Sequence, residues 1–359
     1  MTSSPSPHRI WLSQSRFGSL DGLRALCILA VLWHHAPIWA GMASPLAGPL
    51  AGSVIWSRGF LGVDAFFVLS GFLITTLLLR ERAALGRFSL RAFYQRRALR
   101  ILPAYYLTVA LAATWAVVFK GRSEDLALVP WYLLFLANFL QGDIALLSPT
   151  WSLSVEEQFY LAWPLALMLL PARLVLPALA LAVGLNVAGI LGVFGSGPQI
   201  GPLILALPNA TYAPMLIGAG LAVILAGPRG FAGLCRVFGG RLAAPLMLGL
   251  VVVLAAVLPE DLRGWPNLGL HLALAGLVAA LVLREDNGLA PLLRAAPLAR
   301  LGAVSYGVYL YHLIAQTLVL RIAPDIAPWA LFVTYSALAW ALAELSFRHF
   351  ESWFARFRP

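Results

Sequence analysis

The apolar residues of this 359-residue chain fall into long runs that are separated by short polar stretches. Eleven such runs can be distinguished, over residues 25–40, 60–79, 101–119, 128–141, 158–172, 174–194, 210–226, 242–258, 267–283, 301–320 and 328–346. A helix needs about 20 apolar residues to cross a hydrocarbon layer of about 30 Å. Because the runs continue from one end of the chain to the other, the pattern predicts an all-α membrane helix bundle that forms a single domain.

The fourth run, over residues 128–141, has only 14 residues and contains a proline near its start. This length is more typical of a re-entrant or interfacial segment than of a crossing. If this run does not cross and the N-terminus is cytoplasmic, 20 of the 25 Lys and Arg residues lie on the cytoplasmic side; if it crosses, 12 lie inside and 13 outside. Positive charge collects in cytoplasmic loops, so the sequence predicts ten crossings and two cytoplasmic termini.

The composition agrees with a membrane protein, because 61% of the residues are hydrophobic and only 11% are charged, against about 25% in soluble proteins. We expect a disordered cytoplasmic N-terminus over residues 1–19, a membrane domain over 20–350 and a cytoplasmic tail over 351–359. The net charge of +10 comes from arginines scattered at the ends of the runs, which indicates topology and not nucleic-acid binding. The spacing of Cys27 and Cys235 supports neither a disulfide framework nor a metal site.

The first run carries ionisable residues at both ends. Arg24 and His35 are 11 residues apart, so a helix brings them within about 20° of the same face and separates them by about 16 Å. Ionisable groups in membrane helices are functional by default, and imidazole is the natural general base near neutral pH. The alternative is that the polar residues at the two ends of the run mark the two headgroup boundaries and have no further function.

The stretch WSLSVEEQFYLAW lies at the outer start of the fifth apolar run. Helical spacing places Ser152, Glu156 and Tyr160 on one face. A serine cap with an acidic first turn accounts for Glu157. The carboxylate of Glu156 is better suited to holding and polarising a histidine, and Asp64 in the second crossing is a second candidate for this role.

The cluster FYQRRALRILP places Arg96, Arg97 and Arg100 at the cytoplasmic end of the third crossing. Their spacing forms a fork of guanidinium groups that suits phosphates. Arginines at this position are also ordinary topology signals and ligands of anionic lipids, so both interpretations stay open.

The stretch AVSYGVYLYHLI places Ser305, Tyr309 and His312 on one polar face of an otherwise apolar helix. Such a face can hold helices together or line a substrate pathway, and the residues alone do not separate these interpretations. His271, in the ninth apolar run, is expected to be structural.

Six stretches, taken in order, resemble the motifs of acyltransferase family 3, a family of integral membrane O-acyltransferases: LDGLRALCILAVLWHHA, GVDAFFVLSGFLITTLLLRE, FYQRRALRILPAYYL, PTWSLSVEEQFYLAWPL, SYGVYLYHLI and FRHFESWF. The resemblance spans nearly the whole chain. The basic residue and histidine of the family's first span fall on Arg24 and His35. Its RxxR pair falls on Arg97 and Arg100, and its glutamate after SV falls on Glu156.

The resemblance implies transfer of an acyl group, usually acetyl, from cytoplasmic acyl-coenzyme A to a hydroxyl of an extracytoplasmic or lipid-linked acceptor. This acceptor is commonly a cell-surface glycan. The resemblance also implies ten spans in the cell (inner) membrane.

In the mechanism that follows from this resemblance, Arg96, Arg97 and Arg100 would hold the phosphates of the donor at the inner face. His35, oriented by Glu156 or Asp64, would take the proton from the acceptor hydroxyl. Arg24 would guide the donor arm or pair with Asp21. The expected substrate pathway consists of Ser152, Ser154, Tyr160, Ser305, Tyr309 and His312.

Two other functions are compatible with the residues. Intramembrane His, Asp and Glu side chains on facing helices can form the proton relay of a transporter for a sugar or small molecule. No internal repeat is apparent, which weighs against an inverted-repeat transporter. A lipid or partner scaffold is the third option, and it requires neither Arg97 nor His35.

Overall fold

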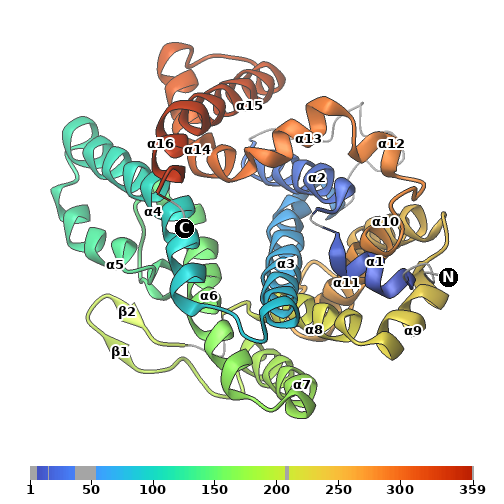
Figure 1. Cartoon of the computed structure of the whole chain (residues 1–359). Coiled ribbons are helices and arrows are strands. Elements are labelled where there is room, and N and C mark those ends of the chain that lie inside the picture. The colour runs from blue at the N-terminus through green and yellow to red at the C-terminus, as the bar shows by residue number, and fades with distance from the viewer. Residues whose placement is uncertain (1–5, 15, 37–53, 207–209, 358–359) are drawn as a thin grey trace.

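The computed structural model describes residues 6–14, 16–36, 54–206 and 210–357. Within these ranges the chain forms a bundle of helices with one short hairpin (Figure 1). The long helices are α2 (Gly18–His34), α3 (Leu61–Leu85), α4 (Leu90–Thr114), α6 (Trp151–Leu169), α7 (Ala172–Ile190), α8 (Ala213–Ala226), α9 (Pro228–Phe238), α10 (Ala243–Val257), α11 (Trp265–Leu283), α14 (Ser305–Ile322) and α15 (Pro328–Leu345). The short elements are α1 (Pro7–Ser13), η3 (Val54–Phe60), η4 (Trp115–Phe119), η5 (Ser123–Leu128), α5 (Val129–Leu133), η6 (Ala137–Phe139), η7 (Ala145–Thr150), α12 (Ala290–Leu293), α13 (Ala296–Ala303), η9 (Ser346–Glu351) and α16 (Ser352–Ala355). Strands β1 (Gln199–Ile200) and β2 (Leu203–Ile204) pair antiparallel.

Each of the ten runs predicted to cross the membrane falls on a long helix, although the predicted end of the first run, residues 37–40, lies outside the described residues. Five helical stretches are long and apolar enough to cross a bilayer, or up to eight if each of three bent helix pairs is one span. The bends are 59° between α1 and α2, 109° between α8 and α9, and 78° between α13 and α14. The chain is therefore a multi-pass helical bundle, and the number of ten crossings stays a prediction.

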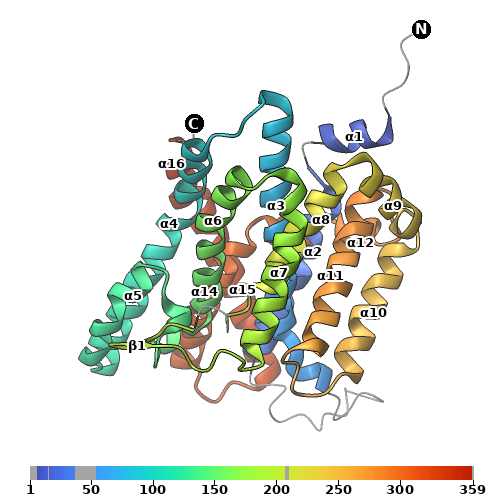
Figure 2. The ribbon, with the colours of Figure 1, turned by 90° about the horizontal axis from the view of Figure 1, so that it is seen from below.

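Helices α2 and α3 stand near the middle of the bundle, with α4, α6 and α14 to α16 on one side and α8 to α11 on the other (Figure 1). Figure 2 shows α1, α9 and α16 at one end of the bundle, and the β1–β2 hairpin toward the opposite end. The two ends of the described chain therefore lie on the same side. The assignment of this side to the cytoplasm stays a prediction.

The segment predicted not to cross, residues 128–141, is broken into short pieces. Helix α5 ends after five residues, and Phe135 follows with a φ of 55°, a left-handed conformation that is uncommon for a bulky residue. Leu140 then pairs with Leu203 in an isolated bridge. Five residues of helix are far too short to cross a bilayer.

Side chains of α6 bind the backbone of this broken segment. Gln158 Nε2 donates a hydrogen bond of 2.8 Å to the carbonyl of Phe135. The N–H of Ala137 donates to Ser154 Oγ at 3.2 Å. Non-helical backbone at membrane depth must find its partners within the protein, and these contacts supply two of them. Ser154, expected in the substrate pathway, thus holds this segment.

The sequence predicts disorder over residues 1–19, whereas the structure contains helix α1 in this stretch. The hydroxyl of Ser6 caps its first turn, and a proline occupies the first helical position, which is a favourable helix start. Trp11 is buried, and its carbonyl accepts a hydrogen bond of 2.7 Å from Arg80. The Arg80 guanidinium also lies 4.9 Å from the centroid of the Trp11 ring, so α1 is fastened to the end of α3.

Glycines allow the central helices α3 and α8 to approach each other closely. A Cβ atom added at Gly71 would lie 2.0 Å from the carbonyl oxygen of Met215, and one added at Gly218 would lie 2.1 Å from that of Val68. Small residues at helix contacts are the common way in which membrane helices pack backbone against backbone. This contact fixes α3, which forms one wall of the site described next.

Candidate active site

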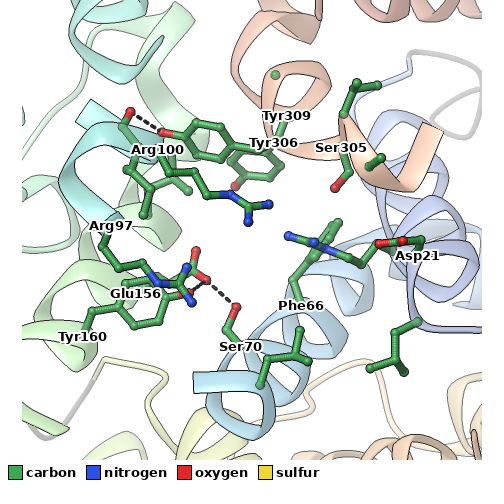
Figure 3. Close-up of a pocket in the computed structure, with 18 of the residues that line it drawn as sticks. Asp21, Phe66, Ser70, Arg97, Arg100, Glu156, Tyr160, Ser305, Tyr306 and Tyr309 are labelled. Atoms are coloured by element: carbon green, nitrogen blue, oxygen red, sulfur yellow. Dashed lines mark hydrogen bonds between the residues drawn. The ribbon is translucent and has the colours of Figure 1, made fainter. Parts of the chain in front are cut away.

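A cavity of about 590 Å³ lies between α2, α3, α4, α6 and α14, and residues of η9 and α16 complete its wall. This volume is in the range of sites for small molecules and cofactors, roughly 300–1,000 Å³. Figure 3 shows Arg97, Arg100 and Glu156 on one side of the cavity, and Asp21 and Ser305 on the other.

Arginines dominate the charged lining of this cavity. Among the described residues the lining includes Arg16, Arg24, Arg80, Arg97 and Arg100, and the acidic residues Asp21, Glu156, Glu157 and Glu351. Guanidinium groups present a planar set of donors that matches phosphate and carboxylate oxygens. A cavity with this lining suits a ligand that carries several anionic groups.

The three arginines predicted to bind the donor do not share one environment. Arg97 and Arg100 line the cavity, and the Arg97 guanidinium lies 4.5 Å from the centroid of the Tyr160 ring. Such a cation–π contact holds the guanidinium in place. Arg96 is not in the lining; it forms an ion pair of 3.2 Å with Glu81, and 43% of its side chain is exposed. Helical phase does not explain the difference, because Arg96 and Arg100 are also neighbours on one face, at i and i+4. The ion pair with Glu81 holds Arg96 outside the cavity.

Glu156 lies on the wall of the cavity, next to Arg97 in Figure 3. Its Oε1 atom accepts hydrogen bonds from the hydroxyls of Ser70 on α3 and Tyr160 on α6. Two hydroxyl donors stabilise an ionised carboxylate in a fixed orientation. The structure therefore places Glu156 beside the arginines. Its partners are the hydroxyls of Ser70 and Tyr160, whereas the sequence predicted His35 as its partner. The sequence analysis missed Ser70, a lone hydroxyl in the apolar run FVLSGFLI.

His35 follows the last residue of α2. Its Nδ1 atom lies 3.0 Å from the carbonyl oxygen of Val31, four residues earlier. A carbonyl only accepts, so Nδ1 carries the hydrogen in the neutral ring, and Nε2 keeps a free lone pair. The centroid of the His35 ring lies 4.8 Å from that of His312 and 5.1 Å from that of His34. His35 is thus a base with a defined tautomer.

Neighbouring helices hold the end of α2, and with it His35. The last carbonyls of a helix have no partner within the helix. Here Tyr335 of α15 donates its hydroxyl hydrogen to the carbonyl of Leu32, and Gln316 Nε2 of α14 donates to the carbonyl of His35 at 2.8 Å. The sequence analysis missed Gln316, although it continues the polar stripe of α14 at the same helical spacing.

The polar stripe of α14 runs from the cavity toward His35. Ser305 and Tyr309 line the cavity, and so do Ser152 and Tyr160 of α6. The Tyr309 hydroxyl lies 2.6 Å from Ser152 Oγ and donates to the carbonyl of Pro149 at 2.7 Å. Four of the six residues expected in the substrate pathway thus lie around one cavity.

His312 and His35 lie beyond this cavity and are not part of its lining. His312 is completely buried, and its ring centroid is 5.8 Å from that of Tyr309 and 4.8 Å from that of His35. The side chains of Tyr309 and His312 therefore stand between the cavity and His35. The cavity therefore ends before it reaches His35.

Arg24 of α2 lines the cavity, whereas His35, on the same predicted face of this helix, does not. Asp64 of α3 does not line it either. Its Oδ2 atom lies 3.4 Å from Nε2 of His271 on α11, and both side chains are buried. The structure therefore pairs Asp64 with His271 and brings it neither to His35 nor to the cavity.

No group of three or more His, Cys, Asp and Glu side chains is placed to hold a metal ion in the part of the chain that the structure describes.

Comparisons with known proteins show which proteins this chain is similar to. The listerial peptidoglycan O-acetyltransferase OatA, from Listeria monocytogenes serovar 1/2a, is 29% identical over 93% of this chain and 55% of its own length. The putative peptidoglycan O-acetyltransferase YrhL of Bacillus subtilis is 29% identical over 82% of this chain and 47% of its own length. The O-acetyltransferase OatA of Staphylococcus aureus strain NCTC 8325 is 33% identical over 43% of this chain and 25% of its own length.

The chain spans about half the length or less of these curated relatives. No solved structure was found to match it. A family model described as an acyltransferase domain matches residues 17–345, which include the whole of α2 to α15. The chain therefore belongs to acyltransferase family 3, the family whose motifs its sequence resembles.

Proposed function

We propose that this chain transfers an acetyl group from acetyl-coenzyme A, bound in the arginine-lined cavity, to a hydroxyl of an extracytoplasmic glycan or lipid-linked glycan precursor. The observation that carries the proposal is the gathering of Arg24, Arg97 and Arg100 around one cavity. Tyr309 of its wall contacts His312, which in turn contacts His35. The names of the relatives, which state peptidoglycan O-acetylation, support the choice of acyl group and acceptor.

Coenzyme A carries several phosphates at one end and a long uncharged arm that ends in sulfur. Arg97 and Arg100, with Arg24 across the cavity, would bind the phosphates. The apolar residues Val63, Phe66 and Leu153 also line this cavity and suit the uncharged arm. Arg96 has no place in this arrangement, because Glu81 holds it outside the cavity.

Glu156 would keep the guanidinium groups in place, since it faces them with its charge and is itself held by Ser70 and Tyr160. His35 would be the general base. Its Nε2 lone pair is available for the acceptor's proton, and general base catalysis of this kind contributes roughly 10²–10⁴-fold. No metal takes part in the proposed reaction.

The positive-inside distribution of 20 against 5 basic residues supports a cytoplasmic position for the arginine-rich end of α4 and an extracytoplasmic position for His35. The protein would then work in the cell (inner) membrane with the donor entering from the cytoplasm. The acceptor would approach from the other side.

The test uses the purified protein in liposomes, with acetyl-coenzyme A labelled in the acetyl group and soluble peptidoglycan fragments as acceptor. The expected product is a labelled, base-labile ester on the glycan, and its formation should be lost in His35→Gln while the protein remains folded. Folded wild-type protein that forms no ester would contradict the proposal. Uptake of the unmodified sugar into the liposomes would instead support a transporter.

A further inference from the structure

His312 is a buried histidine with one ring nitrogen that nothing in the described structure satisfies. The side chain is fully buried between α14 and the end of α2. Its Nδ1 atom lies 2.6 Å from the carbonyl oxygen of Tyr309, and its Nε2 atom has no hydrogen-bond partner among the described residues. Buried polar atoms are nearly always hydrogen-bonded, so an unsatisfied one calls for a physical explanation.

The two neighbouring imidazoles have the same tautomer. In both rings Nδ1 faces a backbone carbonyl, which only accepts, so Nδ1 is the protonated nitrogen in His35 and in His312. Both Nε2 atoms then carry lone pairs. Two lone pairs cannot form a hydrogen bond with each other. Once one Nε2 atom has taken up a proton, however, the neighbouring ring, whose centroid is 4.8 Å away, holds a lone pair that can accept this proton in a hydrogen bond that the neutral pair does not form.

No carboxylate takes this partner role in the described structure. The residue that the sequence suggested first, Glu156, accepts from Ser70 and Tyr160. The second candidate, Asp64, lies against His271. A protonated His35 therefore has the ring of His312, and not a carboxylate, as its neighbour.

His312 lies on α14 next to both the donor cavity and the proposed base. One turn before it, Tyr309 lines the donor cavity. On its other side lies His35. The ring centroids of Tyr309, His312 and His35 follow one another at 5.8 Å and 4.8 Å. His312 is thus the group that separates the donor cavity from the proposed base.

We propose that His312 is the second member of a two-histidine proton relay, which carries the proton of the acceptor hydroxyl to the leaving sulfur of coenzyme A. This inference rests on the proposed acetyl transfer. The hydroxyl oxygen forms a bond to the acetyl carbon, the carbon–sulfur bond breaks, and its electron pair leaves on sulfur. The proton passes from the hydroxyl to Nε2 of His35, then to Nε2 of His312, and finally to the thiolate. Both histidines return to their neutral state, and no further reactant is needed.

The experiment measures acetyl transfer by the full chain in liposomes with His312→Ala and His312→Gln. Removal of a proton-transfer group should lower kcat by about 100-fold or more and leave the KM for acetyl-coenzyme A unchanged. Added imidazole should restore part of the kcat of His312→Ala. Pyrazole has the same shape but is a much weaker base, so it should not restore activity.

The matched control is Tyr311→Phe. Tyr311 precedes His312 on the same helix, and its hydroxyl lies 2.9 Å from Ser346 Oγ. Neither Tyr311 nor Ser346 lines the cavity. This variant should keep the wild-type kcat.

Equal rescue by imidazole and pyrazole would assign His312 a purely space-filling role and overturn the relay. A wild-type kcat in His312→Gln would overturn it as well, and this variant decides the question if His312→Ala does not fold. In either case acetyl transfer by the wild type would still stand. A wild-type protein without transfer would refute the proposed function itself.

Discussion

The ring of His312 packs against the ring of His35 at an interplanar angle of 63°, with the ring centroids 4.8 Å apart. This contact brings α14 to the end of α2, and Gln316 of the same helix binds the carbonyl of His35. One turn earlier, α14 contributes Tyr309 to the arginine-lined cavity. A single helix therefore touches both the proposed donor site and the proposed base.

Arg97→Ala should weaken the binding of coenzyme A. A hydrogen bond to a charged group contributes about 1.5–3 kcal/mol, so the dissociation constant should rise by roughly 10- to 150-fold. Titration calorimetry of the detergent-solubilised protein measures this change. Arg96→Ala is the matched control, because Arg96 is the preceding residue but pairs with Glu81 outside the cavity. Equal effects of the two substitutions would place the phosphates elsewhere.

Two substitutions of Tyr160 should distinguish the contribution of its ring to coenzyme A binding from that of its hydroxyl. Tyr160→Phe keeps the ring beside Arg97 and loses only the hydroxyl that binds Glu156. Tyr160→Leu loses the ring as well, and with it a cation–π contact of about 0.5–2 kcal/mol, so coenzyme A should bind roughly 2- to 30-fold more weakly than in Tyr160→Phe. Indistinguishable dissociation constants in the two variants would show that the ring does not position Arg97.

His271→Ala should destabilise the protein without lowering the turnover of the folded fraction. The substitution leaves the buried carboxylate of Asp64 without its neighbour, and breaking a buried pair in this way costs about 3–5 kcal/mol. Thermal unfolding in detergent measures the loss, and the stability lost in the double variant Asp64→Asn, His271→Ala should be smaller than the sum of the two single losses. If Asp64→Asn instead abolished turnover at unchanged stability, the result would assign Asp64 a catalytic role.

Two glycines of α8 should respond in opposite ways to alanine. At Gly218 an added Cβ would lie 2.1 Å from a backbone carbonyl of α3, so α3 and α8 would have to separate, at a cost of about 1–3 kcal/mol. At Gly220 the nearest atom would be 3.9 Å away, and alanine favours helix by roughly 0.5–1 kcal/mol. The melting temperature should therefore fall in Gly218→Ala and not in Gly220→Ala. A fall of equal size in the melting temperatures of both variants would mean that α3 and α8 do not pack closely at Gly218.

Periodicity and apolar length were sufficient to predict the helices, and the motif spacing was sufficient to name Arg24, Arg97 and Arg100 as candidate site residues. These properties depend only on residues close together in the sequence. The broken segment after α4 was also foreseeable, because its apolar run is short and contains a proline.

The partners of the ionisable groups were not foreseeable in the same way. Helical phase tells which face carries Glu156 or Asp64, but it does not tell which helix packs against that face. The sequence analysis therefore paired both carboxylates with His35, whereas tertiary packing gives Glu156 two hydroxyl partners and Asp64 a different histidine. The neighbour of His35 is His312, 277 positions later in the sequence numbering.

The most direct test of the account is an experimental structure of the protein with a thioether analogue of acetyl-coenzyme A that cannot transfer its acetyl group. The account predicts phosphates within hydrogen-bond distance of Arg97 and Arg100, and the sulfur end of the arm beside Tyr309 and His312. An analogue bound outside this cavity, or one with its phosphates at the Tyr309 end, would contradict it.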